Sequence, residues 1–194
     1  MIRLIAAVLA LVTAIAYGQQ SDAERLAIIE SYRDARVSNQ SDYLFDKGDF
    51  PTIIAALRYR LAMTPTDYET MTDLAWMYKN TERPDLELAV VVQFRRDNPT
   101  LADAMYPEAE FYFNKRSYVQ TIELLSKAIK MTPPPQANAF RILAHSYSRI
   151  GFLKESLAVW DQYLKLVPDD GAALINRKRV ADRIAAQKDK SESS

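Results

Sequence analysis

The side chains that most often do chemistry in proteins are scarce in this sequence. His145 is the only histidine, and there is no cysteine. A histidine-based zinc site, a thiolate metal site and a Ser-His-Asp triad each need further ligands or catalytic partners. The sequence neighbours of His145, Ala144 and Ser146, do not supply them. We interpret His145 as a solvated histidine on a helix face. The sequence therefore predicts no catalytic residue and no metal site.

Other catalytic and cofactor patterns are equally weak. The sequence has 4 scattered glycines, which form neither a phosphate-binding loop nor a dinucleotide fingerprint, so we expect no cofactor. Asp and Glu are plentiful and leave a carboxylate-only site open. No spacing singles out a pair of them, because charged residues on helices usually face solvent. We therefore do not expect an enzyme.

The composition favours an all-helical domain of ordinary size. The 194 residues include 48% apolar residues, enough to fill a core, and the low glycine content suits helices. Lys and Arg number 25, and so do Asp and Glu. This balance argues against general nucleic-acid binding, which needs a surplus of positive charge.

The N-terminal segment has the features of a signal peptide. Arg3 precedes an uncharged stretch at 4–17, which is shorter than the ~20 residues that a membrane-spanning helix needs. The pairs Ala14 with Ala16 and Ala16 with Gly18 each fit cleavage, after Ala16 or Gly18. We expect an exported protein, periplasmic or secreted, with the bacterial envelope favoured. An uncleaved anchor and a buried helix are the alternatives.

Prolines recur at a nearly constant interval. Pro65, Pro99, Pro133 and Pro168 are 34, 34 and 35 residues apart, and each follows a segment with helical apolar spacing. If each repeat begins 31 residues before its proline, several positions match between repeats. The fourth position is large and apolar (Met71, Met105, Phe140), and the eighth is alanine (Ala75, Ala109, Ala144). The eleventh is tyrosine (Tyr78, Tyr112, Tyr147), and the twenty-fourth is again large and apolar (Leu57, Val91, Leu125, Trp160). A period of this length is typical of a helical solenoid.

These positions resemble the pattern of the tetratricopeptide repeat (TPR) over about residues 34–168. The resemblance implies an all-α, right-handed superhelical solenoid of antiparallel helix pairs, about 3.5–4 units, with a C-terminal capping helix. It is weakest in the opening helix of the first repeat. In the third repeat, Glu108 replaces the usual leucine, and Pro107 should kink the first helix or delay its start.

The expected boundaries follow from the repeats and from local helix signals. Ser21 and Glu24 form a capping box, and residues 39–41 should break or loosen the helix that follows. The expected segments are a signal peptide 1–18, an N-terminal helix with a degenerate first repeat helix 21–47, repeats 34–67, 68–101, 102–136 and 137–170, a capping helix 171–187, and a disordered tail 188–194.

The resemblance also implies a site, because the first helices of TPR units line a concave groove. Mapped onto this sequence, the groove positions give a surface that is aromatic in the middle and basic in the fourth repeat. The expected partner-binding residues are Thr72, Trp76, Lys79, Asn80, Tyr106, Glu110, Phe113, Asn114, Arg141, His145 and Arg149. The carboxylate clamp of chaperone-docking TPR domains is absent from these positions. The alternative is that the final helix or a neighbouring subunit fills the groove.

Three functions fit these observations to different degrees. The leading hypothesis is a scaffold or adaptor of the envelope or secreted space that binds a protein or peptide in the groove. The second is a membrane-anchored assembly subunit that keeps its N-terminal segment, and only then would the protein contact a membrane. The third, an enzyme with an unrecognised acidic site, is the weakest. The sequence leaves homo-oligomerisation open.

Overall fold

The computed structural model describes residues 21–192, and the chain divides into two compact units. Unit 1 ends at Ala56 and unit 2 begins at Leu57, within helix α3 (Phe50–Met63). Each unit is described separately below. The expected signal peptide, 1–18, lies outside the described residues. No helix within residues 21–192 is both long and apolar enough to cross a membrane.

Unit 1 consists of α2 (Asp22–Asp46) and the first part of α3. The capping box is confirmed, because the Ser21 hydroxyl accepts from the Glu24 N–H while the Glu24 carboxylate accepts from the Ser21 N–H. The break expected at 39–41 is wrong, since α2 runs through these residues. Asn, Gln and Ser each cost less than about 1 kcal/mol relative to Ala in a helix, too little to end one.

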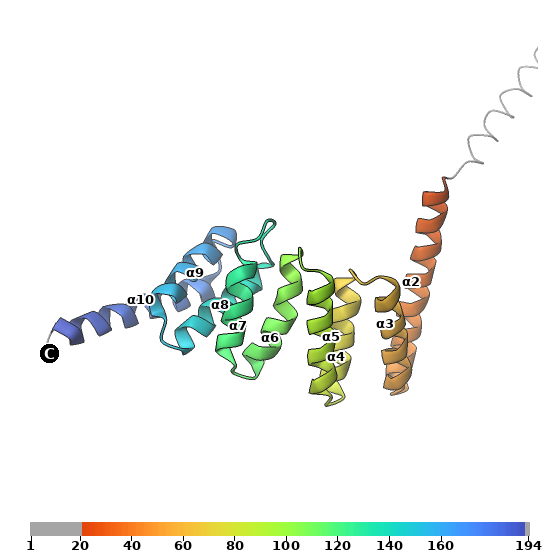
Figure 1. The fold of residues 1–194 in the computed structure, drawn as a ribbon, viewed down its shortest axis with the longest axis horizontal. Helices are drawn as coiled ribbons and strands as arrows, with labels where there is room; N and C mark the ends of the chain where they lie inside the picture. Colours follow the sequence, from red (N-terminus) through yellow and green to blue (C-terminus); the bar gives the residue numbers. More distant parts are fainter. Residues whose placement is uncertain (1–20, 193–194) are drawn as a thin grey trace, which may run out of the picture. The chain divides into compact units, whose positions relative to one another are not determined.

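Unit 2 contains three successive antiparallel helix pairs, as expected for an all-α solenoid (Figure 1). Every regular element of the described residues is helical. The pairs and the final helix are α4 (Tyr68–Asn80) with α5 (Pro84–Asp97), η1 and α6 (Ala102–Met105, Tyr106–Asn114) with α7 (Tyr118–Ala128), α8 (Ala137–Arg149) with α9 (Leu153–Leu166), and α10 (Gly171–Glu192).

The matching sequence positions form the core of these pairs. The large residues of the twenty-fourth position are buried in every repeat, with Leu125 and Trp160 fully inaccessible. Ala109 and Ala144 of the eighth position are also fully buried, which lets the two helices of a pair lie close together. At the twentieth position, the Thr121 hydroxyl donates to the Ala109 carbonyl at 3.2 Å. The Ser156 hydroxyl donates to the Ala144 carbonyl at 2.8 Å in the next pair.

The turns between paired helices share one backbone conformation. The residue at the fifteenth position has a positive φ in all four repeats: Gly48 (70°), Glu82 (57°), Arg116 (60°) and Gly151 (88°). Glycine, which adopts a positive φ without strain, occupies this position only in the first and fourth repeats. Glutamate and arginine adopt the left-handed region at a cost, because their Cβ approaches the following carbonyl oxygen. The turn geometry is therefore set by the helix pairs and not by the residue type.

The third repeat begins late, as Pro107 predicts. Residues 102–105 form a 3₁₀ turn, and α6 starts at Tyr106 with Pro107 in its first turn, where a missing N–H removes no helical hydrogen bond. Glu108, which replaces an apolar residue, is only 5% exposed. Its carboxylate pairs with the Arg95 guanidinium of α5 at 2.5 Å, so its charge is compensated across the repeat boundary.

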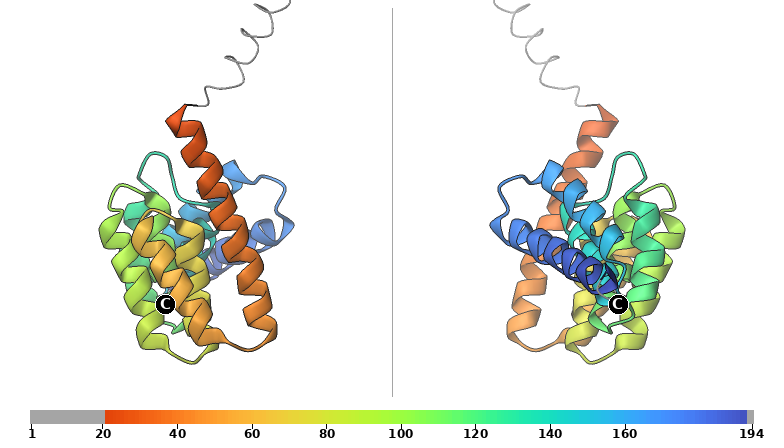
Figure 2. Two further views of the ribbon diagram at one scale, coloured as in Figure 1. Left: turned by 90° about the vertical axis from the view of Figure 1, so that its right-hand side faces the viewer. Right: turned by 90° about the vertical axis from the view of Figure 1, so that its left-hand side faces the viewer.

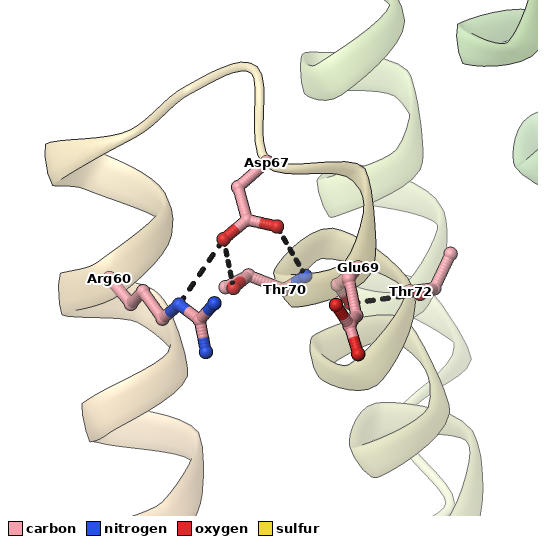
Figure 3. Close-up of polar contacts among 5 residues, drawn as sticks. All are labelled: Arg60, Asp67, Glu69, Thr70 and Thr72. Carbon is pink, nitrogen blue, oxygen red and sulfur yellow. Dashed lines mark hydrogen bonds and ion pairs between the residues drawn. The ribbon is translucent and has the colours of Figure 1, made fainter. Parts of the chain in front are cut away.

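Aspartates at equivalent repeat positions join successive helices. Asp67 caps α4 by accepting from the Thr70 N–H at 3.0 Å and the Thr70 hydroxyl at 2.7 Å (Figure 3). Arg60 of α3 also contacts this carboxylate, at 3.2 Å. Burial raises the pKa of Asp67, but the Thr70 hydrogen bonds and Arg60 outweigh burial and lower it overall. At the other end of unit 2, Asp170 caps α10 and accepts from the Tyr163 hydroxyl at 2.6 Å.

The final helix packs on the last pair (Figure 2). Arg177 of α10 pairs with Asp161 of α9 at 2.5 Å. We expected a disordered tail at 188–194. Residues 188–192 are helical instead, because α10 continues to Glu192. No glycine or proline follows Gly171, and a helix once formed propagates through residues of moderate propensity.

The left-handed turn residues provide a test of the repeat geometry. We expect Arg116→Gly to raise the free energy of unfolding by about 0.5–1 kcal/mol, because glycine adopts φ near 60° without strain. Arg96→Gly, at an exposed position of helix α5, should instead lower it by about 1 kcal/mol. Urea unfolding followed by circular dichroism measures both. Equal destabilisation by the two changes would contradict a strained turn.

Candidate functional site

A pocket lies between the first helices of two neighbouring repeats, α4 and α6. Its volume is about 320 Å³. We name it the Trp76 pocket after the side chain that is exposed in it, at 49%. It is lined by Tyr68, Thr72, Asp73, Ala75, Trp76, Lys79, Glu87, Val91, Tyr106, Pro107, Glu110, Phe111 and Asn114. The pocket is thus partly aromatic, with charged groups of both signs.

A second pocket adjoins it near the helix-pair turns. This turn pocket has a volume of about 380 Å³ and is lined by Lys79, Glu82, Pro84, Glu87, Phe111, Asn114 and Lys115. Lys79, Glu87, Phe111 and Asn114 belong to both pockets. The two pockets therefore form one recessed surface that runs along α4 and α6.

The Trp76 pocket gathers six of the expected groove residues: Thr72, Trp76, Lys79, Tyr106, Glu110 and Asn114. Asn80 is not among the lining residues, and its amide donates to the Trp76 carbonyl at 2.8 Å. Phe113 packs edge to face on Tyr118 at 5.9 Å. Arg141, His145 and Arg149 lie on α8, outside both pockets.

The sequence analysis missed Glu87, Phe111, Asp73 and Tyr68 as pocket residues. Glu87 had a detectable signal, because it occupies the twentieth repeat position, where the next two repeats place Thr121 and Ser156. Those two hydroxyls are fully buried between paired helices, whereas Glu87 is half-buried and lines both pockets. A departure from the repeat pattern thus puts a carboxylate into the recess.

Hydrogen bonds from the next repeat fix one wall of the Trp76 pocket. The Asn138 amide of α8 donates to the Tyr106 hydroxyl, and this hydroxyl donates to Glu110 Oε1, each at 2.5 Å. Burial and the Glu110 carboxylate raise the pKa of Tyr106, so the phenol stays protonated and remains a donor. The position of the Glu110 carboxylate is therefore set by Tyr106 of the same helix and, through Tyr106, by Asn138 of α8.

Two hydrogen bonds of Gln136 connect the second and third repeats at the N-terminal edge of the groove. The Gln136 backbone N–H donates to Asp103 at 2.7 Å, and its side-chain amide donates to the Tyr68 hydroxyl at 3.0 Å. Burial is the main cause that raises the pKa of Tyr68, to about 12. These bonds join the start of α4 to the residue that precedes α8.

Two carboxylates of the Trp76 pocket are incompletely compensated. Burial raises the pKa of Glu87; Lys79 and Lys115 oppose this rise, and Glu110 adds to it. Burial also raises the pKa of Asp73, and Glu69 adds to the effect while Arg60 opposes it. Both shifts indicate negative charge that the surrounding groups do not fully stabilise.

His145 is not the solvated residue that the sequence predicted. It is half-buried and packs edge to face on the buried Trp160 ring, with ring centroids 5.0 Å apart. Burial lowers its pKa, and Arg141, Arg149 and Arg179 lower it further. The third of these arginines comes from α10, which the sequence could not place beside α8.

The final helix occupies part of the fourth-repeat face. Arg183 of α10 donates to the Ser148 hydroxyl of α8 at 2.7 Å. Arg141 reaches toward α9, where its guanidinium lies over the Tyr163 ring at 6.0 Å. Arg183 thus brings α10 to Ser148 on the fourth-repeat face, whereas the Trp76 pocket lies between α4 and α6.

A third cavity, of about 510 Å³, opens between α3, α4 and α5. Its walls are mainly apolar, and they come from Arg58, Leu61, Ala62, Pro65, Leu74, Tyr78, Leu86, Ala89, Val90, Gln93, Phe94 and Asp97. None of the expected site residues lines it. Within residues 21–192, no group of three or more potential His, Asp or Glu ligands is placed to hold a metal ion.

The fold defined by these helix pairs is the TPR fold. No family model matches the sequence, and no curated protein matches it. Solved structures are nevertheless similar. A MamA protein is 21% identical, with 80% of this chain and 88% of that chain covered and a TM-score of 0.57.

Two further structures are described as TPR proteins. TTC0263 of Thermus thermophilus is 17% identical, with 73% and 77% coverage of this chain and that chain and a TM-score of 0.54. A protein of Parabacteroides merdae is 14% identical, with 94% and 67% coverage and a TM-score of 0.56. At these identities the likeness establishes the fold, and the function must come from the site.

The single histidine allows a direct test of the fourth-repeat electrostatics. We expect His145 to titrate below 6.5, because burial and three arginines disfavour its charged form. At lower pH the unfolded chain then binds a proton that the folded chain does not. Stability should therefore fall as the pH drops from about 6.5 through the folded-state pKa.

The His145 Cε1–H signal in an NMR titration measures this pKa. Arg179→Ala should move the midpoint upward, since it removes one repelling charge. A midpoint at or above 6.5 in the unchanged protein would contradict the packing of His145 on Trp160.

Proposed function

We propose that this protein is a non-enzymatic scaffold that binds a segment of a partner protein along α4 and α6. The observation that carries the proposal is the recessed surface of the two adjoining pockets, with Trp76 exposed in it. A large aromatic side chain with a polar group is a frequent anchor of protein recognition. The TPR fold supports this reading by analogy, because solenoids present extended surfaces to partners.

The energetics of Trp76 also favour a binding role. It lies at the ninth repeat position, whereas the buried side chains of the same helix include Met71, Leu74 and Tyr78. Leaving half of a tryptophan ring in water forgoes hydrophobic stabilisation that a partner could recover. Glu110 and Asn114, on the facing helix, add polar groups that could fix the orientation of a bound chain.

We place this scaffold in the envelope or secreted space. The support is the sequence of residues 1–18 alone, with its basic start, its short uncharged stretch and its two small-residue pairs. The absence of cysteine is compatible with an oxidising compartment, because the fold is then stabilised by packing and not by disulfides.

The binding surface can be tested before the partner is known. A photo-crosslinking amino acid in place of Trp76 should give a covalent adduct of defined mass in cells of the source organism. The matched control is Tyr59, which is 67% exposed on α3 and lines none of the pockets. Adducts of the same kind from both positions would contradict a specific site at Trp76.

The captured partner then allows the energetic test. Trp76→Ala should weaken its binding by more than about 1 kcal/mol and leave the melting temperature nearly unchanged. Trp160→Ala should do the reverse and cost about 3–5 kcal/mol of stability, because this ring is fully buried. Isothermal calorimetry and thermal unfolding separate the two effects. Unfolding by Trp76→Ala would show that the groove assignment is wrong.

The proposed location makes a separate prediction. Mass spectrometry of the protein purified from its source should find a mature N-terminus at Tyr17 or Gln19, the residues that follow the two cleavage sites. An intact N-terminus in a membrane fraction would instead favour the membrane-anchored assembly subunit.

A further inference from the structure

The charges of the Trp76 pocket are unequal. Three carboxylates line it, those of Asp73, Glu87 and Glu110, against the single ammonium group of Lys79. The adjoining turn pocket is balanced, with Glu82 and Glu87 against Lys79 and Lys115. Selection by charge should therefore occur in the Trp76 pocket.

The Glu110 carboxylate is held in place before any ligand arrives. The Tyr106 hydroxyl occupies Oε1, and Asn138 holds that hydroxyl from the next helix pair. The second oxygen, Oε2, is the one that a ligand would bind. A charged hydrogen-bond acceptor that is fixed in advance loses little conformational entropy on binding.

The aromatic wall limits the chemistry of the ligand further. Trp76 stands on the same helix as Asp73, one turn further along, and its ring is half exposed. An aromatic face attracts a cation electrostatically and packs against an alkyl chain. The volume of about 320 Å³ suits one long side chain with its backbone, and it lies at the lower limit of ligand pockets.

We propose that the Trp76 pocket binds one arginine or lysine side chain of the partner segment, with Glu110 and Glu87 as its charge partners and Trp76 as its packing surface. This inference rests on the proposed function. An acidic side chain would meet like charge in the pocket. An apolar one would bury the carboxylates further without a compensating group, which is costly. A basic side chain satisfies both the charge and the aromatic wall.

The test uses a randomised dodecapeptide library displayed on phage and the full-length protein as the target. Peptides that bind the unchanged protein and not Trp76→Ala are selected and sequenced. We expect arginine or lysine to recur at one position. In the synthetic peptide, replacement of that arginine by citrulline, or of that lysine by norleucine, should weaken binding about tenfold or more, because the charged hydrogen bond is lost.

Glu110→Gln supplies the matching change in the protein. It should also lower the affinity for the basic peptide about tenfold. Its effect on the affinity for the neutral peptide should be small, because Glu110 and the basic side chain are expected to form a direct pair that the neutral peptide already lacks. Glu123→Gln on α7 is the control, since this side chain is 69% exposed and lines none of the three pockets. It should leave the affinity unchanged.

The outcomes separate the inference from the proposed function. Two results would overturn the proposed binding of an arginine or lysine side chain and leave the scaffold proposal intact. One is a set of Trp76-dependent peptides without a shared basic residue, and the other is an affinity that Glu110→Gln does not change. A selection that yields no Trp76-dependent peptide would contradict both.

Discussion

The close approach of paired helices at the alanine positions is the constraint on which unit 2 depends. Ala109 and Ala144 are fully inaccessible, and a hydroxyl from the partner helix donates to the carbonyl of each. Large side chains such as Leu125 and Trp160 can then fill the space between successive pairs. Small residues at one position and large residues at another thus determine how the pairs stack.

The candidate site arises where this arrangement is altered. In the second repeat, the residue that would donate to Ala75 is Glu87, which is too long and too polar for the space between helices. Glu87 lines the recess instead, and there it meets Lys79 and Glu110. The delayed start of α6, with Pro107 in its first turn, is a second alteration, and Tyr106 at that start lines the same recess. Function is thus inferred from departures from the repeat and not from its shared positions.

Much of the architecture could be predicted from the sequence because the repeat reports packing directly. The buried positions recur at fixed spacing, so Val91, Leu125 and Trp160 could be assigned to the core in advance. The same reasoning brought Trp76 and Tyr106 together, which line one pocket.

Contacts between distant segments could not be predicted in this way. The edge-to-face packing of His145 on Trp160 and the approach of Arg179 depend on where α10 lies. The continuity of α2 through 39–41 was missed because weak helix formers were given the weight of true helix breakers. Glu87 was missed because it stands out only when the residues at the twentieth position of the repeats are compared for polarity as well as size.

The bond from Gln136 to Tyr68 has a mechanical consequence. It connects residues 68 positions apart in the sequence, so the N-terminal ends of α4 and α8 cannot spread without breaking it. Solenoids can bend between successive repeats, and this hydrogen bond opposes such bending along one edge of unit 2.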